Sequence, residues 1–106
     1  MELTVLERLV LQGLLPKEGN YATLKLLRKA REALSFDDLE NKRLMFIQDG
    51  EQIRWDEEES KKIVKDIEIG EMMTIEVNKA LKKLNEEGKL RDEHITLYEK
   101  FIEGQP

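Results

Sequence analysis

The stretch FIQDGEQIRW (residues 46–55) decides the fold class, because it predicts a β-hairpin in a chain whose other segments mostly predict helices. Asp49-Gly50 separates two short runs of strand character, and glycine tolerates the positive φ that tight hairpin turns require. Ile53 and Trp55 alternate with polar residues, so one face of the second strand is apolar. Two strands alone are marginally stable in water, so another segment must cover or extend this hairpin.

Residues 62–69 are the candidate for that extension. Ile63, Ile67 and Ile69 fall on one face of an extended chain, which favours a third strand. The acidic run DEEE that precedes them equally suits the N-terminal turn of a helix. The sequence therefore leaves residues 57–69 open between strand and helix, and favours a strand with room for a single helical turn before it.

Apolar spacing and capping residues predict four main helices and one short helix in the rest of the chain. The expected ranges are residues 4–15, 20–34, 35–42 (the short helix, capped by Ser35), 71–87 and 92–102. The fold class is then α+β, mainly helical, with a small two- or three-stranded antiparallel sheet. At 106 residues the chain is expected to be one globular domain, residues 1–106.

The first helix is expected at the centre of the fold. It begins with the capping-box pattern of Thr4 and Glu7, and its apolar residues occupy nearly every side of the helical wheel. Only Glu7, Arg8 and Gln12 are left to contact water. In the last helix we expect Ile95, Tyr98, Phe101 and Ile102 to face inward.

Composition excludes several classes of protein. The chain has a net charge of −5, which argues against nucleic acid as the default partner. It has no cysteine and a single histidine, which exclude disulfides and argue against a zinc site. No apolar run approaches the roughly 20 residues of a membrane span. The start, MELTVLERLV, lacks the features of a signal peptide and predicts a cytoplasmic protein.

No catalytic or cofactor motif is present, so the chain is expected to be neither an enzyme nor a cofactor-binding protein. His94 is predicted to be a surface or half-packed residue of the last helix, and no nucleophile–base spacing accompanies it. The acidic run Asp56–Glu59 lacks the alternating ligands and the fixed glycine of a calcium loop. We expect no metal and no cofactor.

Three residues are candidates for a protein interface. Trp55 is expected mainly to close the helical core, with the hairpin as its lid, but tryptophan is also a common interface anchor. Met72 and Ile75 lie off the apolar stripe of residues 71–87, and a two-fold homodimer would bury them. The identity of the protein partner cannot be deduced from the sequence.

The second helix carries four cations, Lys25, Arg28, Lys29 and Arg31, while residues 37–59 hold nine acids against three cations. We expect these two segments to pair with each other rather than with a partner. The alternative is a winged-helix-like DNA-binding regulator that uses these four cations. Against it, the exposed face of this helix offers no Asn or Gln to read bases, and the wing sequence QDGEQ is acidic.

Two long stretches carry a resemblance, LTVLERLVLQGLLPKEGNYATLKLLRKAREALSF and IEIGEMMTIEVNKALKKLNEEGKLRDEHITLYEKFIE. They are similar to small uncharacterised proteins encoded by phages and prophages of bacteria. The resemblance implies a phage context and the cytoplasm of a bacterial host, but no activity. The expected function is a non-enzymatic protein-interaction or assembly module of phage or prophage origin.

Overall fold

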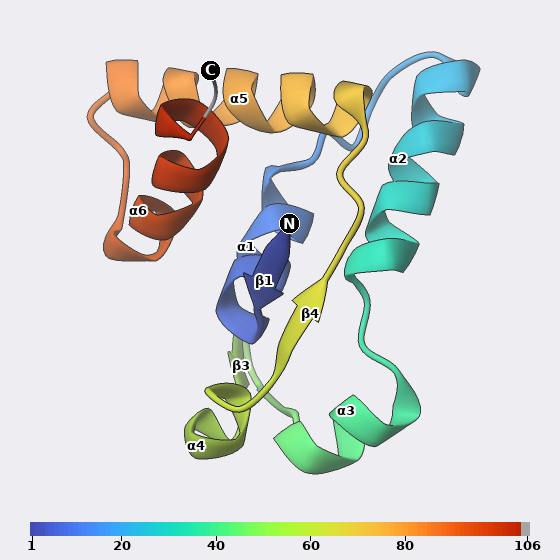
Figure 1. Cartoon of the computed structure of the whole chain (residues 1–106), viewed down its shortest axis with the longest axis vertical. Helices are drawn as coiled ribbons and strands as arrows, with labels where there is room; N and C mark the ends of the chain where they lie inside the picture. The colour runs from blue at the N-terminus through green and yellow to red at the C-terminus, as the bar shows by residue number, and fades with distance from the viewer. Residues whose placement is uncertain (105–106) are drawn as a thin grey trace.

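The computed structural model describes residues 1–104, and these form a mainly helical α+β fold as predicted (Figure 1). The elements in chain order are β1 (Glu2–Thr4), α1 (Val5–Leu14), α2 (Tyr21–Leu34), α3 (Asp38–Leu44), β2 (Ile47–Asp49), β3 (Gln52–Arg54), α4 (Glu57–Ser60), β4 (Val64–Asp66), α5 (Glu71–Glu86), α6 (Asp92–Tyr98) and the π-helical η1 (Glu99–Glu103). None of the helices in residues 1–104 combines the length and apolar character that crossing a membrane requires.

The four strands form two separate antiparallel pairs rather than one sheet. β2 and β3 form the predicted hairpin, in which Gln48 lies opposite Ile53. Residues 62–69 do supply a strand, β4, but it pairs with β1 at the N-terminus, where Leu3 lies opposite Lys65. The expectation that this strand extends the hairpin is wrong. The helical turn α4 lies between β3 and β4 and separates β4 from the hairpin. The actual partner, β1, has only three residues, which are too few to indicate a strand in the sequence.

The main core surrounds α1, as predicted, with α2, α5 and α6 packed around it (Figure 1). Its fully buried residues come from all four of these helices. Leu11 of α1, Leu27 of α2, Leu81 of α5 and Leu97 of α6 are among them. Burial of α1 is not all-round, however, because Leu6 is exposed.

Arg8 is fully buried, although the sequence predicts that it contacts water. Its guanidinium donates hydrogen bonds to the carbonyl oxygens of Leu34 and Ser35 and to the carboxylate of Glu40. It also stacks on the ring of Phe36, 4.1 Å from the ring centroid. The last carbonyls of a helix lack intrahelical partners, and Arg8 satisfies those at the end of α2. Burial is therefore compatible with its charge.

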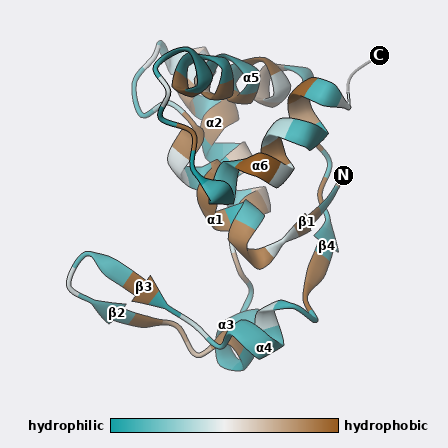
Figure 2. Cartoon of the chain, turned by 90° about the vertical axis from the view of Figure 1, so that its left-hand side faces the viewer, coloured by the Kyte–Doolittle hydropathy of each residue, from teal (hydrophilic) through white to brown (hydrophobic). Residues whose placement is uncertain are grey.

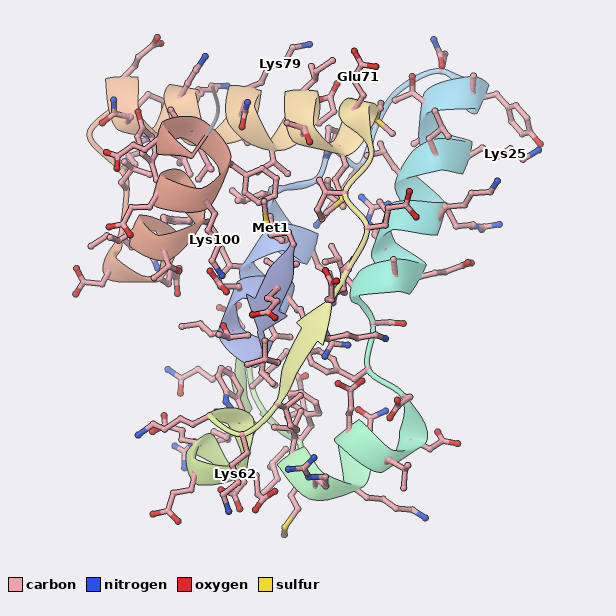
Figure 3. The ribbon with its side chains drawn as sticks, viewed as in Figure 1. Met1, Lys25, Lys62, Glu71, Lys79 and Lys100 are labelled. Atoms are coloured by element: carbon pink, nitrogen blue, oxygen red, sulfur yellow. The ribbon has the colours of Figure 1, made fainter. Side chains whose placement is uncertain are left out.

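Glu7 is buried as well, again contrary to expectation. Its Oε1 accepts hydrogen bonds from the backbone N–H of Thr4, at 3.0 Å, and from Nζ of Lys100, at 2.7 Å. Lys100 also donates to the carbonyl of Glu2, so η1 is tied to the start of the chain (Figure 3). Burial raises the pKa of Glu7, but the bonds from Lys100 and Thr4 outweigh it and hold this pKa below its ordinary value of 4.5.

The C-terminal helices also depart from prediction. His94 is buried, whereas the sequence predicted a surface or half-packed residue; its Nδ1 accepts the backbone N–H of Arg91 at 2.9 Å and so keeps a polar partner. Ile95 was expected to face inward but is 51% exposed, and Leu97 takes the buried position instead. Phe101 is buried as expected, and Tyr98 and Ile102 are half-buried against the core.

Several helix ends match the sequence closely. The capping box of Thr4 and Glu7 opens α1, Asn20 caps α2, and Gly88 follows α5 with φ +67°. The short helix α3 starts later than predicted. Its N-cap is Asp37, whose side chain and that of Glu40 form a reciprocal capping box, while the predicted cap, Ser35, ends α2.

A second, smaller apolar cluster lies under the base of the hairpin. Val5, Leu44 and Ile63 form its buried centre, with Leu9, Phe36, Phe46 and Trp55 packed around them. All six residues of β2 and β3 are exposed, and the hairpin projects away from the helices (Figure 2). The prediction that the hairpin is a lid is wrong. Only Trp55, at its base, packs inward as expected.

Candidate functional site

An apolar groove separates the projecting hairpin from the helical body, and we call it the hairpin groove. Its volume is about 350 Å³. Residues of α1, of the segment around α3 and of the hairpin line it: Leu9, Gln12, Ser35, Phe36, Asn41, Phe46, Ile47, Gln48 and Ile53. A concave, mostly apolar surface with a few polar groups is the usual form of a binding site.

The pleat of the hairpin determines which side chains overhang the groove. Trp55 and Phe46 flank the hairpin base, and their ring centroids are 6.2 Å apart. One step outward, Ile53 lies opposite Gln48 on the same face as Trp55. Ile53 is 47% exposed because the second apolar cluster does not extend that far. The turn beyond it begins with Gly50, whose φ of +62° suits the first central position of a two-residue loop.

The floor of the groove is held in place from below. The ring of Phe36 lies between the guanidinium of Arg8 and the ring of Phe46, whose centroid is 5.2 Å away. Arg8 is itself held by hydrogen bonds to two backbone carbonyls and by its buried salt bridge with Glu40. These contacts position Phe36 in the lining of the groove.

Side-chain amides supply the polar groups of the groove. The amide nitrogen of Gln12 donates to the carbonyl of Leu34, and that of Asn41 donates to the carbonyl of Phe36. These bonds orient the two amides. Within residues 1–104 neither amide oxygen accepts a hydrogen bond, so both remain acceptors for a ligand that brings N–H donors.

The groove lining has no charged side chain, but acidic residues adjoin it along the chain. Asp49 and Glu51 flank Gly50 at the hairpin tip, and Asp37 and Asp38 directly follow Phe36; we call these four acids the acidic rim. Asp49 pairs with Arg54 at 3.5 Å. In the part of the chain that the structure describes, the other three acids form no ion pair. The rim therefore favours a cationic ligand.

The three predicted interface residues do not form one surface. Trp55 is half-buried at the hairpin base, on the rim of two smaller hollows outside the groove. Met72 is half-buried against the main core and lines a hollow of about 560 Å³ between α2 and the start of α5. Ile75 is exposed on α5, which lies at the opposite end of the molecule from the hairpin (Figure 1).

The four cations of the predicted DNA-binding surface are only partly brought together. Lys25, Arg28 and Arg31 line a shallow hollow of about 370 Å³ on α2, and Lys25 lies on the outer side of that helix (Figure 3). Lys29 lines the hollow that contains Met72. Arg31 is half-buried and donates to the carbonyl of Pro16.

The expected pairing between this basic helix and the acidic segment is wrong. Within residues 1–104 no ion pair joins Lys25, Arg28, Lys29 or Arg31 to any acid, because the acids with partners use other cations. Glu59, for example, pairs with Arg43 and Lys62. The exposed cations of α2 are thus available to another molecule.

Sequence reasoning missed most of the groove. Phe36, Phe46 and Ile47 were not among its candidates, although Phe46 and Ile47 open the hairpin stretch.

Within residues 1–104 no group of three or more acidic or histidine side chains is placed to hold a metal ion. Comparison with protein-family models, with curated proteins and with solved structures found no match.

Proposed function

We propose that the chain is a non-enzymatic protein-interaction module that binds a partner polypeptide in the hairpin groove. One observation carries this proposal: all six strand residues of the hairpin are exposed, and they hold Ile53, which is 47% exposed, over an apolar groove that Ile47, 59% exposed, also lines. These side chains add little to the stability of the free protein. Exposed apolar surface with a polar rim is typical of an interaction site.

The hairpin is also short, and no third strand of residues 1–104 pairs with it; such a hairpin is marginal in water without further contacts. A bound partner would bury Ile47 and Ile53 and supply those contacts. The amide oxygens of Gln12 and Asn41 would accept hydrogen bonds from the partner and fix its position. The groove thus offers apolar area for affinity and polar groups for specificity.

The phage or prophage origin is part of the proposal, and the resemblance of the two long stretches of sequence supports it. A bacterial cytoplasm would then be the place of action. Gene neighbourhood tests this part. Adjacent packaging and tail genes would indicate an assembly role, repressor genes would indicate regulation, and a neighbourhood without phage genes would contradict the proposed origin.

Site-specific photo-crosslinking tests the groove itself. Ile53 would be replaced by a benzophenone-bearing residue in cells of the natural source. The matched control carries the same residue in place of Ile95, an isoleucine of α6 with similar exposure, 51%. We expect a polypeptide adduct from position 53 and none from position 95. Adducts at neither position, or equal yields at both, would contradict the proposal.

Lys25, Arg28 and Lys29 of α2 are exposed and form no ion pair within residues 1–104, which supports a second candidate, the winged-helix-like DNA-binding regulator. Lys25, Arg28 and Lys29 would contact phosphates, while the acidic hairpin tip would oppose them. Binding to random duplex DNA should then weaken steeply as the salt concentration rises. A flat response, or no binding at low salt, would rule out this candidate.

A further inference from the structure

The outer face of α2 has the pattern of a helix that docks into a groove. Tyr21, Leu24, Lys25 and Arg28 follow the spacing i, i+3, i+4, i+7 and so lie on one side of the helix. Tyr21 is 80% exposed, and Leu24 is also exposed. We call these four residues the α2 face. Its aromatic and aliphatic side chains have no role in the core, and Lys25 and Arg28 form no ion pair within residues 1–104.

The hairpin groove complements the α2 face in two properties, its apolar lining and the charge of the acids next to it. Its lining is mostly apolar and includes Phe36, Phe46 and Ile53. Three acids of the adjoining acidic rim, Asp37, Asp38 and Glu51, form no ion pair within residues 1–104. An apolar floor with an acidic rim fits a helix that presents apolar anchors next to cations.

The α2 face cannot reach the groove of its own chain. The two surfaces share no lining residue. Both are attached to α2, whose C-terminus leads directly into the groove at Ser35 and Phe36. Tyr21 and Ser35 are separated along this rigid helix by roughly 21 Å, at 1.5 Å per residue. Contact between the two surfaces therefore requires two molecules.

We infer that the hairpin groove receives the α2 face of a second copy of this chain. Tyr21 and Leu24 enter between Ile53 and the two phenylalanines. Lys25 and Arg28 meet the acidic rim. The inference rests on the proposed function, because it names the polypeptide that the groove binds. The favourable charge pairing makes the association weaken as salt screens it.

Two variants separate the two halves of the contact. The first, Lys25→Glu with Arg28→Glu, removes the cations of the α2 face and keeps the groove. The second, Ile47→Ser with Ile53→Ser, removes the apolar overhang of the groove and keeps the α2 face. Exposed sites on other elements provide matched controls: Lys82→Glu with Lys83→Glu makes the same change in charge on α5, and Ile95→Ser makes the same type of change on α6.

Sedimentation velocity over a concentration series measures the outcome, with far-UV circular dichroism confirming that each variant is folded. We expect wild-type protein and both controls to self-associate. For each test variant alone, the dissociation constant of self-association should rise about tenfold or more, which is the effect of losing one interface hot spot. An equimolar mixture of the two folded variants should form a heterodimer, because the intact α2 face of one fits the intact groove of the other.

Several results would overturn the inference. These are a wild type that stays monomeric at high micromolar concentration, folded variants that form no heterodimer on mixing, and association that only Ile75→Ser disrupts. The last result would instead place a dimer on α5. If the wild type is monomeric but the Ile53 adduct contains a different protein, the inference fails and the proposed function stands. If position 53 also gives no adduct, both fail.

Discussion

At the scale of single residues, Arg8 connects the fold to the site. It is fully buried, donates to two carbonyls at the end of α2, pairs with Glu40 and stacks on Phe36. Arg8→Ala should lower the free energy of unfolding by about 3–5 kcal/mol, because it removes the cation that pairs with Glu40 and the donor to the Ser35 carbonyl, while Gln12 still donates to the Leu34 carbonyl. Urea unfolding at neutral pH measures this loss. Arg43→Ala, which breaks the more exposed pair with Glu59, should cost less than about 1 kcal/mol. Equal losses of unfolding free energy in the two variants would show that the buried contacts of Arg8 contribute no more to stability than an exposed ion pair does.

At the same scale, the lowered pKa of Glu7 predicts how the stability of the fold depends on pH. Its pKa is lower in the folded protein than its ordinary value of 4.5, so its contribution to stability is present above that value. The contribution is lost as the pH falls through the lowered, folded-state pKa. Glu7→Gln should therefore be less stable than wild type at neutral pH, and the gap should narrow on acidification. Unfolding free energies measured across this pH range test it, and a constant gap would contradict the assigned pairing with Lys100.

The burial of Glu7, Arg8 and His94 could not be predicted from the sequence. Each is polar, and a helical wheel assigns polar residues to water. Each is buried because a specific partner distant in the chain or on the backbone satisfies it: Lys100 for Glu7, the end of α2 for Arg8, and the N–H of Arg91 for His94. Apolar periodicity carries no information about such partners.

At the scale of elements, the hairpin divides into an anchored base and a free arm. Trp55 packs against the second apolar cluster, while Ile53 lies beyond it. Trp55→Ala should lower the free energy of unfolding by about 2–3 kcal/mol, less than a fully buried aromatic residue would. Ile53→Ala should change it by less than about 1 kcal/mol. Chemical unfolding compares the two variants, and a larger loss for Ile53 would contradict the projecting arm.

Local signals predicted several elements, because the capping box of Thr4 and Glu7, the turn glycine Gly50 and the glycine after α5 depend on neighbouring residues. The hairpin loop itself is Gly50-Glu51 rather than the predicted Asp49-Gly50. Strand pairing was not predictable in the same way. β4 pairs with β1 some sixty residues earlier in the chain, and β1 is three residues long. The short β1 has no alternation to detect, so the sequence suggested the neighbouring hairpin as the partner.

At the scale of the whole molecule, the candidate site arises from the arrangement of elements. The hairpin groove combines residues of α1, α3 and the hairpin, and the sequence indicated only the hairpin. Its basic counterpart, the α2 face, was visible as charge in the sequence. What the sequence could not reveal is that, within residues 1–104, the acidic and basic segments form no ion pairs with each other.

Removing the hairpin arm tests the central claim, that the groove is a binding site which the fold itself does not need. Residues 47–54 would be replaced by Asn-Gly, a loop that suits the close approach of Phe46 and Trp55 at the hairpin base. The benzophenone residue would replace Gln12 on the groove floor, in both the shortened chain and the full-length chain. Because the arm is exposed, we expect the free energy of unfolding of the shortened chain to lie within about 1 kcal/mol of that of the full-length chain. We also expect it to lose the adduct that the full-length chain forms. A shortened chain that fails to fold, or one that folds and keeps the adduct, would contradict the account.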